Sequence, residues 1–279
     1  MILKLTNLGR RSIGFNSNSI KSINQSMEGQ LWKACSDGNI EEVHRLLQNS
    51  QLNTNWKDPE YSRTSLYIAC ENGHTEVVKL LLTDPRVDIN QSLNNNSIPL
   101  WIACFKGYIE IVKLFVNDNR VDINQALNSS NETLFYIACR EGHLEIVKLL
   151  LNDQRVDDFN RINDVGWTSF WIACYYGHID IVKLLVNDNR IDINKTNKIG
   201  ATPFYTACQE GRIEIVRLLI NDQRVDINKP DNNGRSSFSI SCENGHIEIA
   251  LLLLNDQRGD IIYYLIKCNI KLSEQIYNS

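Results

Sequence analysis

The sequence predicts an all-α protein, a solenoid of about seven helix–turn–helix units joined by hairpin-like loops. Seven of the eight cysteines stand 34 or 35 residues apart along the chain. The segments around them repeat one arrangement of apolar and polar residues, which is typical of stacked helical repeats. The cysteines that mark this period are Cys35, Cys70, Cys104, Cys139, Cys174, Cys208 and Cys242.

Each unit is expected to contain two helices, a turn and a loop. In the fifth unit the first helix is expected over residues 168–176 and ends at Gly177, because glycine readily adopts the left-handed conformation that ends helices. The second helix is expected over residues 179–186, where the apolar side chains recur on one face. A polar stretch rich in turn residues follows, with the sequence NDNRIDINKTNKIG.

The repeats are expected to fill residues 28–259, between two segments of different composition. Residues 1–27 contain no Asp or Glu and are rich in Ser and Asn, so we expect a flexible basic leader. Organelle transit peptides share this composition, and a targeting role for residues 1–27 stays open. After the repeats we expect a C-terminal capping helix from about Asp260 to Lys271 and a short tail, so that residues 260–279 form the end of the chain.

Composition excludes several classes of function. Among 279 residues, Lys and Arg number 29 against 33 Asp and Glu, and no basic segment stands out in the body of the chain, so nucleic acid is not expected as a partner. The longest apolar stretches, such as residues 247–254, are far shorter than the roughly 20 residues that cross a bilayer. We therefore expect no membrane span, and we find no secretory signal at the N-terminus.

The copies resemble ankyrin repeats. The family pattern T-P-L-H-x-A-A-x-x-G-H, an I-V-x-L-L-L helix and a final D-V-N are matched in the sixth copy, and the resemblance covers about residues 28–262. It implies a solenoid that binds partner proteins in a concave groove. The matching residues are Thr202, Pro203, Phe204, Ala207, Gly211, Ile215, Val216, Leu218, Leu219, Asp226 and Asn228.

Three departures from the family pattern carry expectations of their own. The family histidine, which hydrogen-bonds the loops of neighbouring repeats, is replaced in six copies by Trp or Tyr, whose N–H or O–H is expected to do part of this work. The loop glycine is Ser62, Asn96 and Asn131 in three copies, and we expect the left-handed turn to persist at the two asparagines. The family's xxGADVN becomes NDxRVDIN, which is one residue longer.

The residues that could carry chemistry are interpreted as structural. Helices of neighbouring repeats stack roughly 8 to 10 Å apart, too far for equivalent cysteines to form disulfides or share a zinc ion, so buried reduced thiols are expected. The histidines after the turn glycine belong to the repeat pattern, and GHIEIV lacks the P-C-x-x-C of zinc deaminases. In the NDxRVD loops we expect Asp to bond local backbone and Arg to reach a neighbouring carboxylate. No catalytic, cofactor or metal residue is expected.

Positions that differ between copies are those that the fold does not dictate. They include the two residues before each turn glycine and one loop residue, the set Arg63, Ser97, Glu132, Trp167, Ala201 and Arg235. On a helical wheel, Ile172, Tyr175 and Tyr176 fall opposite the interior, and the resemblance places such positions on the binding groove. Aromatic and Arg residues often dominate binding energy. The candidate partner-binding residues are Phe105, Lys106, Arg140, Glu141, Trp167, Tyr175 and Tyr176.

The sequence thus predicts a non-catalytic protein–protein interaction module with an unidentified protein partner and no cofactor. Two alternatives stay open: an adaptor that presents a client protein to a ubiquitin ligase or kinase, and an organelle-targeted or secreted effector. We expect a monomer in the cytoplasm, with the nucleus open as well, since unpaired cysteines suit a reducing compartment.

Overall fold

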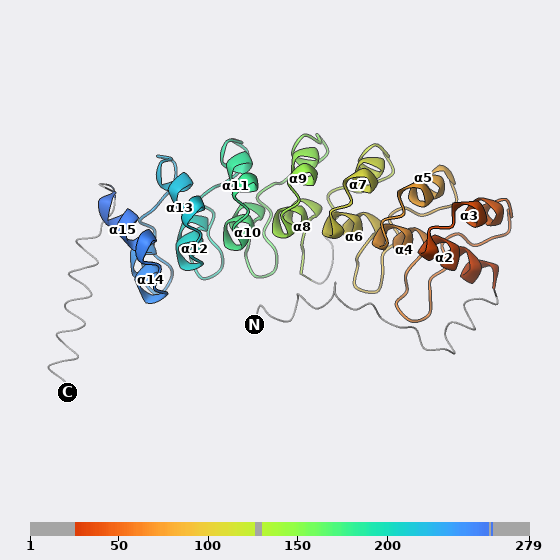
Figure 1. Ribbon diagram of the computed structural model, residues 1–279, viewed down its shortest axis with the longest axis horizontal. Coiled ribbons are helices and arrows are strands. Elements are labelled where there is room, and N and C mark those ends of the chain that lie inside the picture. Colours follow the sequence, from red (N-terminus) through yellow and green to blue (C-terminus); the bar gives the residue numbers. More distant parts are fainter. Residues whose placement is uncertain (1–25, 126–129, 257, 259–279) are drawn as a thin grey trace, which may run out of the picture. The chain divides into compact units, whose positions relative to one another are not determined.

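A computed structural model describes residues 26–125, 130–256 and 258 of the chain. Within this part the chain forms fourteen helices, which pair into seven repeats (Figure 1). The predicted capping helix from Asp260 to Lys271 and nearly all of the predicted leader lie outside the described residues. The helices are α2 (Met27–Asp37), α3 (Ile40–Leu47), α4 (Ser65–Glu71), α5 (Thr75–Thr83), α6 (Pro99–Lys106), α7 (Ile109–Val116), α8 (Leu134–Glu141), α9 (Leu144–Leu151), α10 (Ser169–Tyr176), α11 (Ile179–Val186), α12 (Pro203–Gln209), α13 (Ile213–Ile220), α14 (Ser237–Glu243) and α15 (Ile247–Asn255).

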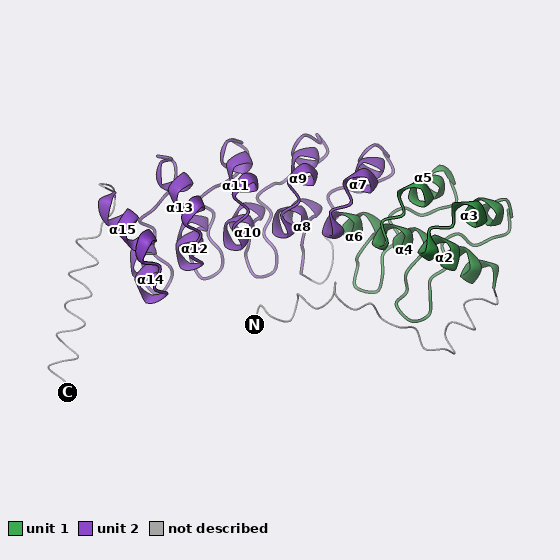
Figure 2. Ribbon diagram, in the orientation of Figure 1, with its two compact units in different colours: residues 1–103 green, residues 104–279 purple. Residues whose placement is uncertain are grey.

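The chain divides into two compact units, with the boundary inside α6 (Figure 2). In the first unit, Met1–Ala103, α2 packs on α3 and α4, and α4 packs on α5. In the second, Cys104–Ser279, the first helices of successive repeats, α8, α10, α12 and α14, pack in one row. The second helices, α7, α9, α11, α13 and α15, pack in another row, as predicted for an all-α solenoid (Figure 1).

Six of the seven described first helices begin at a Ser or Thr side-chain cap, and α2, α8 and α10 end at a glycine cap. In α10 the hydroxyl of Thr168 accepts a hydrogen bond from the backbone N–H of Trp171 at 3.1 Å, which satisfies a donor that the helix leaves free at its N-terminus. Gly177 ends the helix at φ 86° and donates its N–H to Ala173. The left-handed φ and a close approach both require glycine at such turns: a Cβ at Gly142 would lie 2.7 Å from the His178 ring of the next repeat.

The core runs between the two rows of helices. Phe170, Ala173 and Cys174 of α10 are buried, as are Val182 and Leu185 of α11, in agreement with the predicted apolar faces. Six of the seven cysteines that mark the period are buried as thiols. Cys242 differs from the expected pattern because it is exposed. It lies in the last repeat, where no further described repeat packs against α14.

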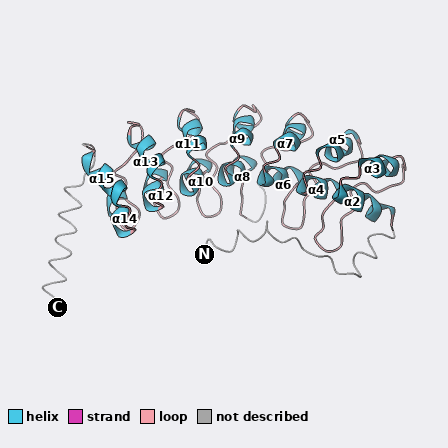
Figure 3. Cartoon of the chain, in the orientation of Figure 1, coloured by secondary structure: helices cyan, strands magenta, loops and turns pink. Residues whose placement is uncertain are grey.

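The segments between the helices are loops (Figure 3), and the part of the chain that the structure describes has one isolated bridge, between Lys57 and Thr64. Each loop turns at a left-handed residue. Asn96 and Asn131 adopt φ values of 63° and 58°, as predicted. Ser62 was not expected to keep the turn, yet its φ is 57°. Compared with the equivalent loops, this loop has one more residue between the backbone groups that are hydrogen-bonded across it. The carboxylate of the buried Asp58 accepts hydrogen bonds from backbone N–H groups inside the loop.

The repeated NDxRVD segment joins neighbouring repeats. In the fourth repeat, Asp153 accepts hydrogen bonds from the backbone and guanidinium of Arg155 and so orients that side chain. Arg155 then donates from Nη2 at 2.6 Å to the carbonyl of Val116, the last residue of α7 in the preceding repeat. Asp153 bonds local backbone and Arg155 pairs with that neighbouring carboxylate, as predicted, whereas the contact from Arg155 to a carbonyl of the preceding repeat was not predicted. We call this arrangement the Asp–Arg clamp; the same contact is made by Arg86 to Leu47, Arg190 to Leu151, Arg224 to Val186 and Arg258 to Ile220.

The asparagine that ends each NDxRVDIN segment forms a second link between repeats. Asn160 donates from Nδ2 to the carbonyl of Arg190 at 2.7 Å and accepts from the N–H of Asp192 at 2.7 Å. Asn194 makes the same two contacts to Arg224 and Asp226 in the following repeat. A side-chain amide thereby satisfies backbone groups that would otherwise lack partners. The longer NDxRVDIN loop, which lacks the family glycine, is therefore hydrogen-bonded to the corresponding loop of the next repeat.

Candidate partner-binding surface

The candidate residues lie at the C-terminal ends of first helices and on one loop. Phe105 and Lys106 end α6, Arg140 and Glu141 end α8, and Tyr175 and Tyr176 end α10, while Trp167 lies in the loop before α10. All seven are half-buried. They form two groups of contacting residues. One group contains the rings of the fifth repeat, and the other contains the charged and aromatic residues of the third and fourth repeats.

The rings of the fifth repeat form a stack, which we call the ring cluster: Trp167, Trp171, Tyr175 and Tyr176. Trp167 and Trp171 are nearly parallel, with centroids 4.9 Å apart and planes at 4°. Tyr175 continues the stack, 5.5 Å from Trp171 at 13°, and Tyr176 meets it edge-on at 5.1 Å. Trp171 is buried, whereas the other three rings keep part of their surface accessible. Stacking fixes the rings, so little conformational entropy remains to be lost when a partner binds.

Backbone contacts hold the ring cluster in place. The indole N–H of Trp171 donates to the carbonyl of Ala201 in the next repeat at 3.3 Å, as expected for the ring that replaces the family histidine. Two other replacement rings reach the following loop in the same way: the hydroxyl of Tyr205 donates to Asp231, and that of Tyr136 accepts from Asn163. At these three positions the ring therefore replaces the family histidine in hydrogen-bonding the loop of the next repeat, as predicted.

The residue after each turn glycine links the same surface to the previous repeat. His178 Nε2 lies 2.9 Å from the carbonyl of Arg140, and His143 Nε2 lies 3.1 Å from that of Phe105. In the sixth repeat Arg212 stands at this position and donates from Nε to the carbonyl of Tyr175 at 2.9 Å. These side chains are occupied by backbone contacts, which confirms their structural interpretation.

Arg140 and Glu141 form an ionic cluster rather than independent contact residues. Arg140 pairs with Glu132 at 2.9 Å and with Glu141 at 2.7 Å, and its guanidinium lies 5.8 Å from the ring centroid of Phe105. Burial lowers the pKa of Arg140, but the two carboxylates outweigh it and the net pKa is raised. Lys106 Nζ lies 6.0 Å from the same ring.

Sequence reasoning missed a pairing between the two variable positions of a repeat. The loop residue and the residue eight positions later contact each other, and their types match. Trp167 stacks with Tyr175 at 6.3 Å, whereas other repeats place an ion pair there. The charges even exchange places between repeats, which was a signal available in the sequence. The ionic pairs are Arg63 with Glu71, Glu132 with Arg140, and Arg235 with Glu243.

Some positions expected on the surface are buried. Ile172 was expected to face away from the interior, but it is 1% exposed, since the first helices of neighbouring repeats pack on both sides of α10. Ser97, Glu132 and Ala201 of the predicted loop set are also buried. Conversely, Val165 and Ile199 were not proposed, yet they are 47% and 51% exposed at the tips of successive loops. The tips touch, because Lys198 bonds the carbonyl of Asp164.

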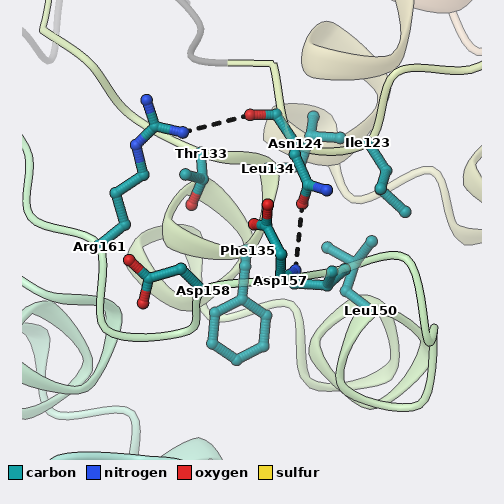
Figure 4. A pocket seen from close by; sticks show the side chains of 10 residues that line it. Ile123, Asn124, Thr133, Leu134, Phe135, Leu150, Asp157, Asp158 and Arg161 are labelled. Carbon is teal, nitrogen blue, oxygen red and sulfur yellow. Dashed lines mark hydrogen bonds between the residues drawn. The ribbon is translucent and has the colours of Figure 1, made fainter.

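One enclosed space among the described residues is too small for a cofactor. A pocket between the loops of the third and fourth repeats has a volume of about 10 Å³, room for about one water molecule (Figure 4). Its polar side chains already serve the fold: Arg161 Nη1 donates to the backbone carbonyl of Asn124, and the side-chain Oδ1 of Asn124 accepts from the N–H of Asp157. Among the described residues no three His, Cys, Asp or Glu side chains converge as metal ligands would. None of the described helices has the length and apolar character of a bilayer-spanning segment.

Stacked helix pairs, cross-repeat clamps and a variable face define a helical repeat protein built for recognition. The family model "Ankyrin repeats (3 copies)" matches residues 13–93, 31–126, 100–197 and 170–263. The chain therefore belongs to the ankyrin repeat family, as its residues predicted. Ankyrin repeats are generally non-catalytic and form protein–protein interaction modules, and the repeats of this chain form such an interaction module.

Curated relatives match a part of the array. Osteoclast-stimulating factor 1 of Rattus norvegicus is 35% identical over 75 residues, which cover 27% of this chain and 34% of that protein. The Sus scrofa protein of the same name is 33% identical over 88 residues, covering 32% of this chain and 40% of the relative. The Danio rerio protein is 33% identical over 75 residues, with coverage of 27% and 34%. The chain thus spans between a third and two fifths of the length of these relatives.

Proposed function

We propose that this protein recognises a partner protein through the ring cluster of its fifth repeat. The observation that carries the proposal is the parallel stack of Trp167, Trp171 and Tyr175, which places accessible aromatic surface at the end of α10. Rigid aromatic residues near the centre of an interface supply a large share of binding energy in many complexes. In the neighbouring repeat, the equivalent positions hold the Glu132–Arg140 ion pair, whose charges neutralise each other.

We include in the proposed surface the exposed loop tips Val165 and Ile199, on the side of the sixth repeat. Phe105 and Lys106 extend it towards the third, where the guanidinium of Arg140 lies over the Phe105 ring. We further propose that Arg140 and Glu141 act mainly by holding this surface in shape, since both are engaged with each other. The compartment proposed is the cytoplasm or nucleus, which suits six buried thiols.

Proximity labelling with the full chain in its native cells tests the proposal. The comparison is between wild type, the double variant Trp167→Ala/Tyr175→Ala and a control, Asp180→Ala/Lys183→Ala, which changes an exposed pair on α11 in the other row of helices. We expect specific proteins to be labelled by the wild type and the control but not by the ring variant. Identical labelling by all three chains would overturn the proposal.

A further inference from the structure

In three places among the described residues the array stacks its own guanidinium on a ring beside a carboxylate. One is Arg190, which lies 4.5 Å from the centroid of Phe159 and pairs with Asp188 at 2.6 Å. Arg63 lies 4.6 Å from the centroid of Tyr61 and 5.3 Å from that of Trp32, and it pairs with Glu71 at 3.2 Å. In the second unit, Arg140 lies over Phe105 and pairs with two carboxylates. Each of these sites combines an aromatic face, an arginine and an acid, a combination in which cation–π attraction and ion pairing act together.

The rings of the fifth repeat and an acid of the sixth, Glu210 at the end of α12, provide the ring and the acid of this combination without the arginine. Trp167 and Tyr175 occupy the positions that hold Arg63 and Glu71 in the second repeat. Within the described part of the chain no Arg or Lys lies over either ring, and Glu210 forms no ion pair there, accepting instead a hydrogen bond from the Gln209 amide at 3.1 Å. Glu210 caps α12, which packs on α10, and Arg212 two residues later donates to the carbonyl of Tyr175 at 2.9 Å, so Glu210 lies in the segment that flanks the rings. In agreement, burial raises the pKa of Tyr175, the charge of Glu210 raises it further, and that of Arg212 lowers it.

Two arginines of the adjoining repeats, Arg212 and Arg140, are engaged with other groups. Arg212 is directed at the backbone, since its Nε donates to the carbonyl of Tyr175. Arg140 is held between Glu132 and Glu141. The surface around the ring cluster therefore combines open aromatic faces with one carboxylate whose charge is not neutralised by a direct pair.

We propose that Trp167, Tyr175 and Glu210 receive an arginine side chain of the partner protein. The planar guanidinium stacks on an aromatic face while its N–H groups bond a carboxylate, and the compact ammonium group of lysine fits this combination less well. This inference rests on the proposed function and adds to it the chemistry of the residue that is recognised.

Nuclear magnetic resonance of the indole N–H groups tests the inference with small probes. The full chain is titrated with N-acetyl-arginine methylamide and, separately, with N-acetyl-citrulline methylamide, which has nearly the same shape but no charge. The Trp167 resonance is assigned by its loss in Trp167→Phe. We expect a saturable shift of the Trp167 and Trp171 resonances with the arginine probe and a shift at least about fivefold smaller with the citrulline probe at equal concentration. Equal shifts with both probes, or none with either, would overturn the inference.

A pair of charge variants adds a matched comparison. Glu210→Gln removes the proposed acid, and Glu145→Gln removes an exposed acid on α9 in the other row of helices. We expect Glu210→Gln to weaken binding of the arginine probe by roughly three- to fivefold and Glu145→Gln to leave it unchanged. Equal affinity in Glu210→Gln and wild type contradicts the inference, provided that thermal unfolding shows both chains folded.

Failure of this inference is distinguishable from failure of the proposed function. If the partner binds the ring variant as tightly as wild type, the ring cluster is not the recognition surface. If the partner needs the rings but binds Glu210→Gln equally well, and replacing its arginines by glutamine has no effect, the recognition surface holds and the arginine assignment fails.

Discussion

At the scale of single residues, the cysteine of the repeat is buried in one copy and exposed in another. Cys174 is fully buried beside Phe170, and burial raises the pKa of its thiol far above the ordinary value. Cys242 occupies the equivalent position in the last repeat but is exposed. The thiolate is the reactive form of cysteine, so the two residues should differ sharply in reactivity.

Alkylation of the native protein followed by mass spectrometry measures this difference. We expect iodoacetamide at pH 8 to modify Cys242 within minutes, while the buried residues Cys35, Cys70, Cys104, Cys139, Cys174 and Cys208 react only after unfolding in denaturant. Denatured protein, in which every thiol reacts, serves as the control. Modification of Cys174 as fast as Cys242 in the native state would contradict the core described above.

Residue-scale predictions from sequence succeeded where the repeat pattern itself fixes the environment. The core places of Phe170 and Cys174, and the hydrogen bond from Trp171 to the next repeat, followed from their position in the copy. Exposure was harder to predict, because it depends on what the neighbouring repeat contributes. Ile172 is covered by adjacent first helices, and Ser62 is held in its turn by the buried Asp58, contacts that the helical wheel of one copy does not contain.

At the scale of the element, the Asp–Arg clamp shows how a loop stabilises a neighbouring helix. Arg155 places a positive charge at the C-terminus of α7 and bonds its last carbonyl, a position where cations are favoured by the helix dipole. The sequence predicted that these loops serve the fold but did not predict the carbonyl. The aspartate is local in sequence, whereas the partner carbonyl lies 39 residues away.

Removing the clamp should destabilise the array measurably. We expect Arg155→Ala to lower the free energy of unfolding by about 1 to 2 kcal/mol, because a helix-terminal carbonyl loses a charged donor. Lys148→Ala removes an exposed lysine paired with Glu145 and should change stability by less than about 0.5 kcal/mol. Urea unfolding followed by circular dichroism compares them, and equal stability of the two variants would exclude the clamp as a stabilising contact.

The aspartates of the clamps also predict how stability depends on pH. The hydrogen bond from Arg155 lowers the pKa of Asp153, and the same cause lowers that of Asp84, Asp118, Asp188, Asp222 and Asp256. A lowered pKa in the folded state stabilises the fold above the unfolded value, about 3.9, and this contribution is lost as pH falls through the folded pKa. We therefore expect no contribution from these groups to a stability change between pH 7 and 5, and a loss below about pH 4 that is smaller in Asp153→Asn.

At the scale of the whole molecule, the period of the sequence was enough to predict the architecture. A period of 34 to 35 residues specifies one structural unit, and stacking such units buries a continuous core. The match of the ankyrin repeat model to residues 13–263 in overlapping segments agrees with it. The partner cannot be predicted in this way, because one repeat fold supports many binding surfaces and only the variable positions differ among them.

The structure reduces the number of variable positions that are candidates for contact with a partner. Pairing within a repeat neutralises the charges at Arg63, Arg140 and Arg235, and it leaves the stacked rings of Trp167 and Tyr175 as the accessible apolar pair. This distinction depends on contacts between residues eight positions apart, one in a loop and the other in the following helix. The residue type at a single position does not reveal such a contact. We therefore propose that recognition depends on the ring cluster rather than on the charged positions.

Titration calorimetry with a partner found by proximity labelling measures how much the ring cluster contributes to binding. Wild type is compared with Trp167→Ala/Tyr175→Ala and with the control Asp180→Ala/Lys183→Ala, after thermal unfolding shows that all three are folded. We predict that the ring variant binds at least about 30-fold more weakly, the effect of losing about 2 kcal/mol at a dominant contact, and that the control binds like wild type. A ring variant that binds within about threefold of wild type would contradict the claim.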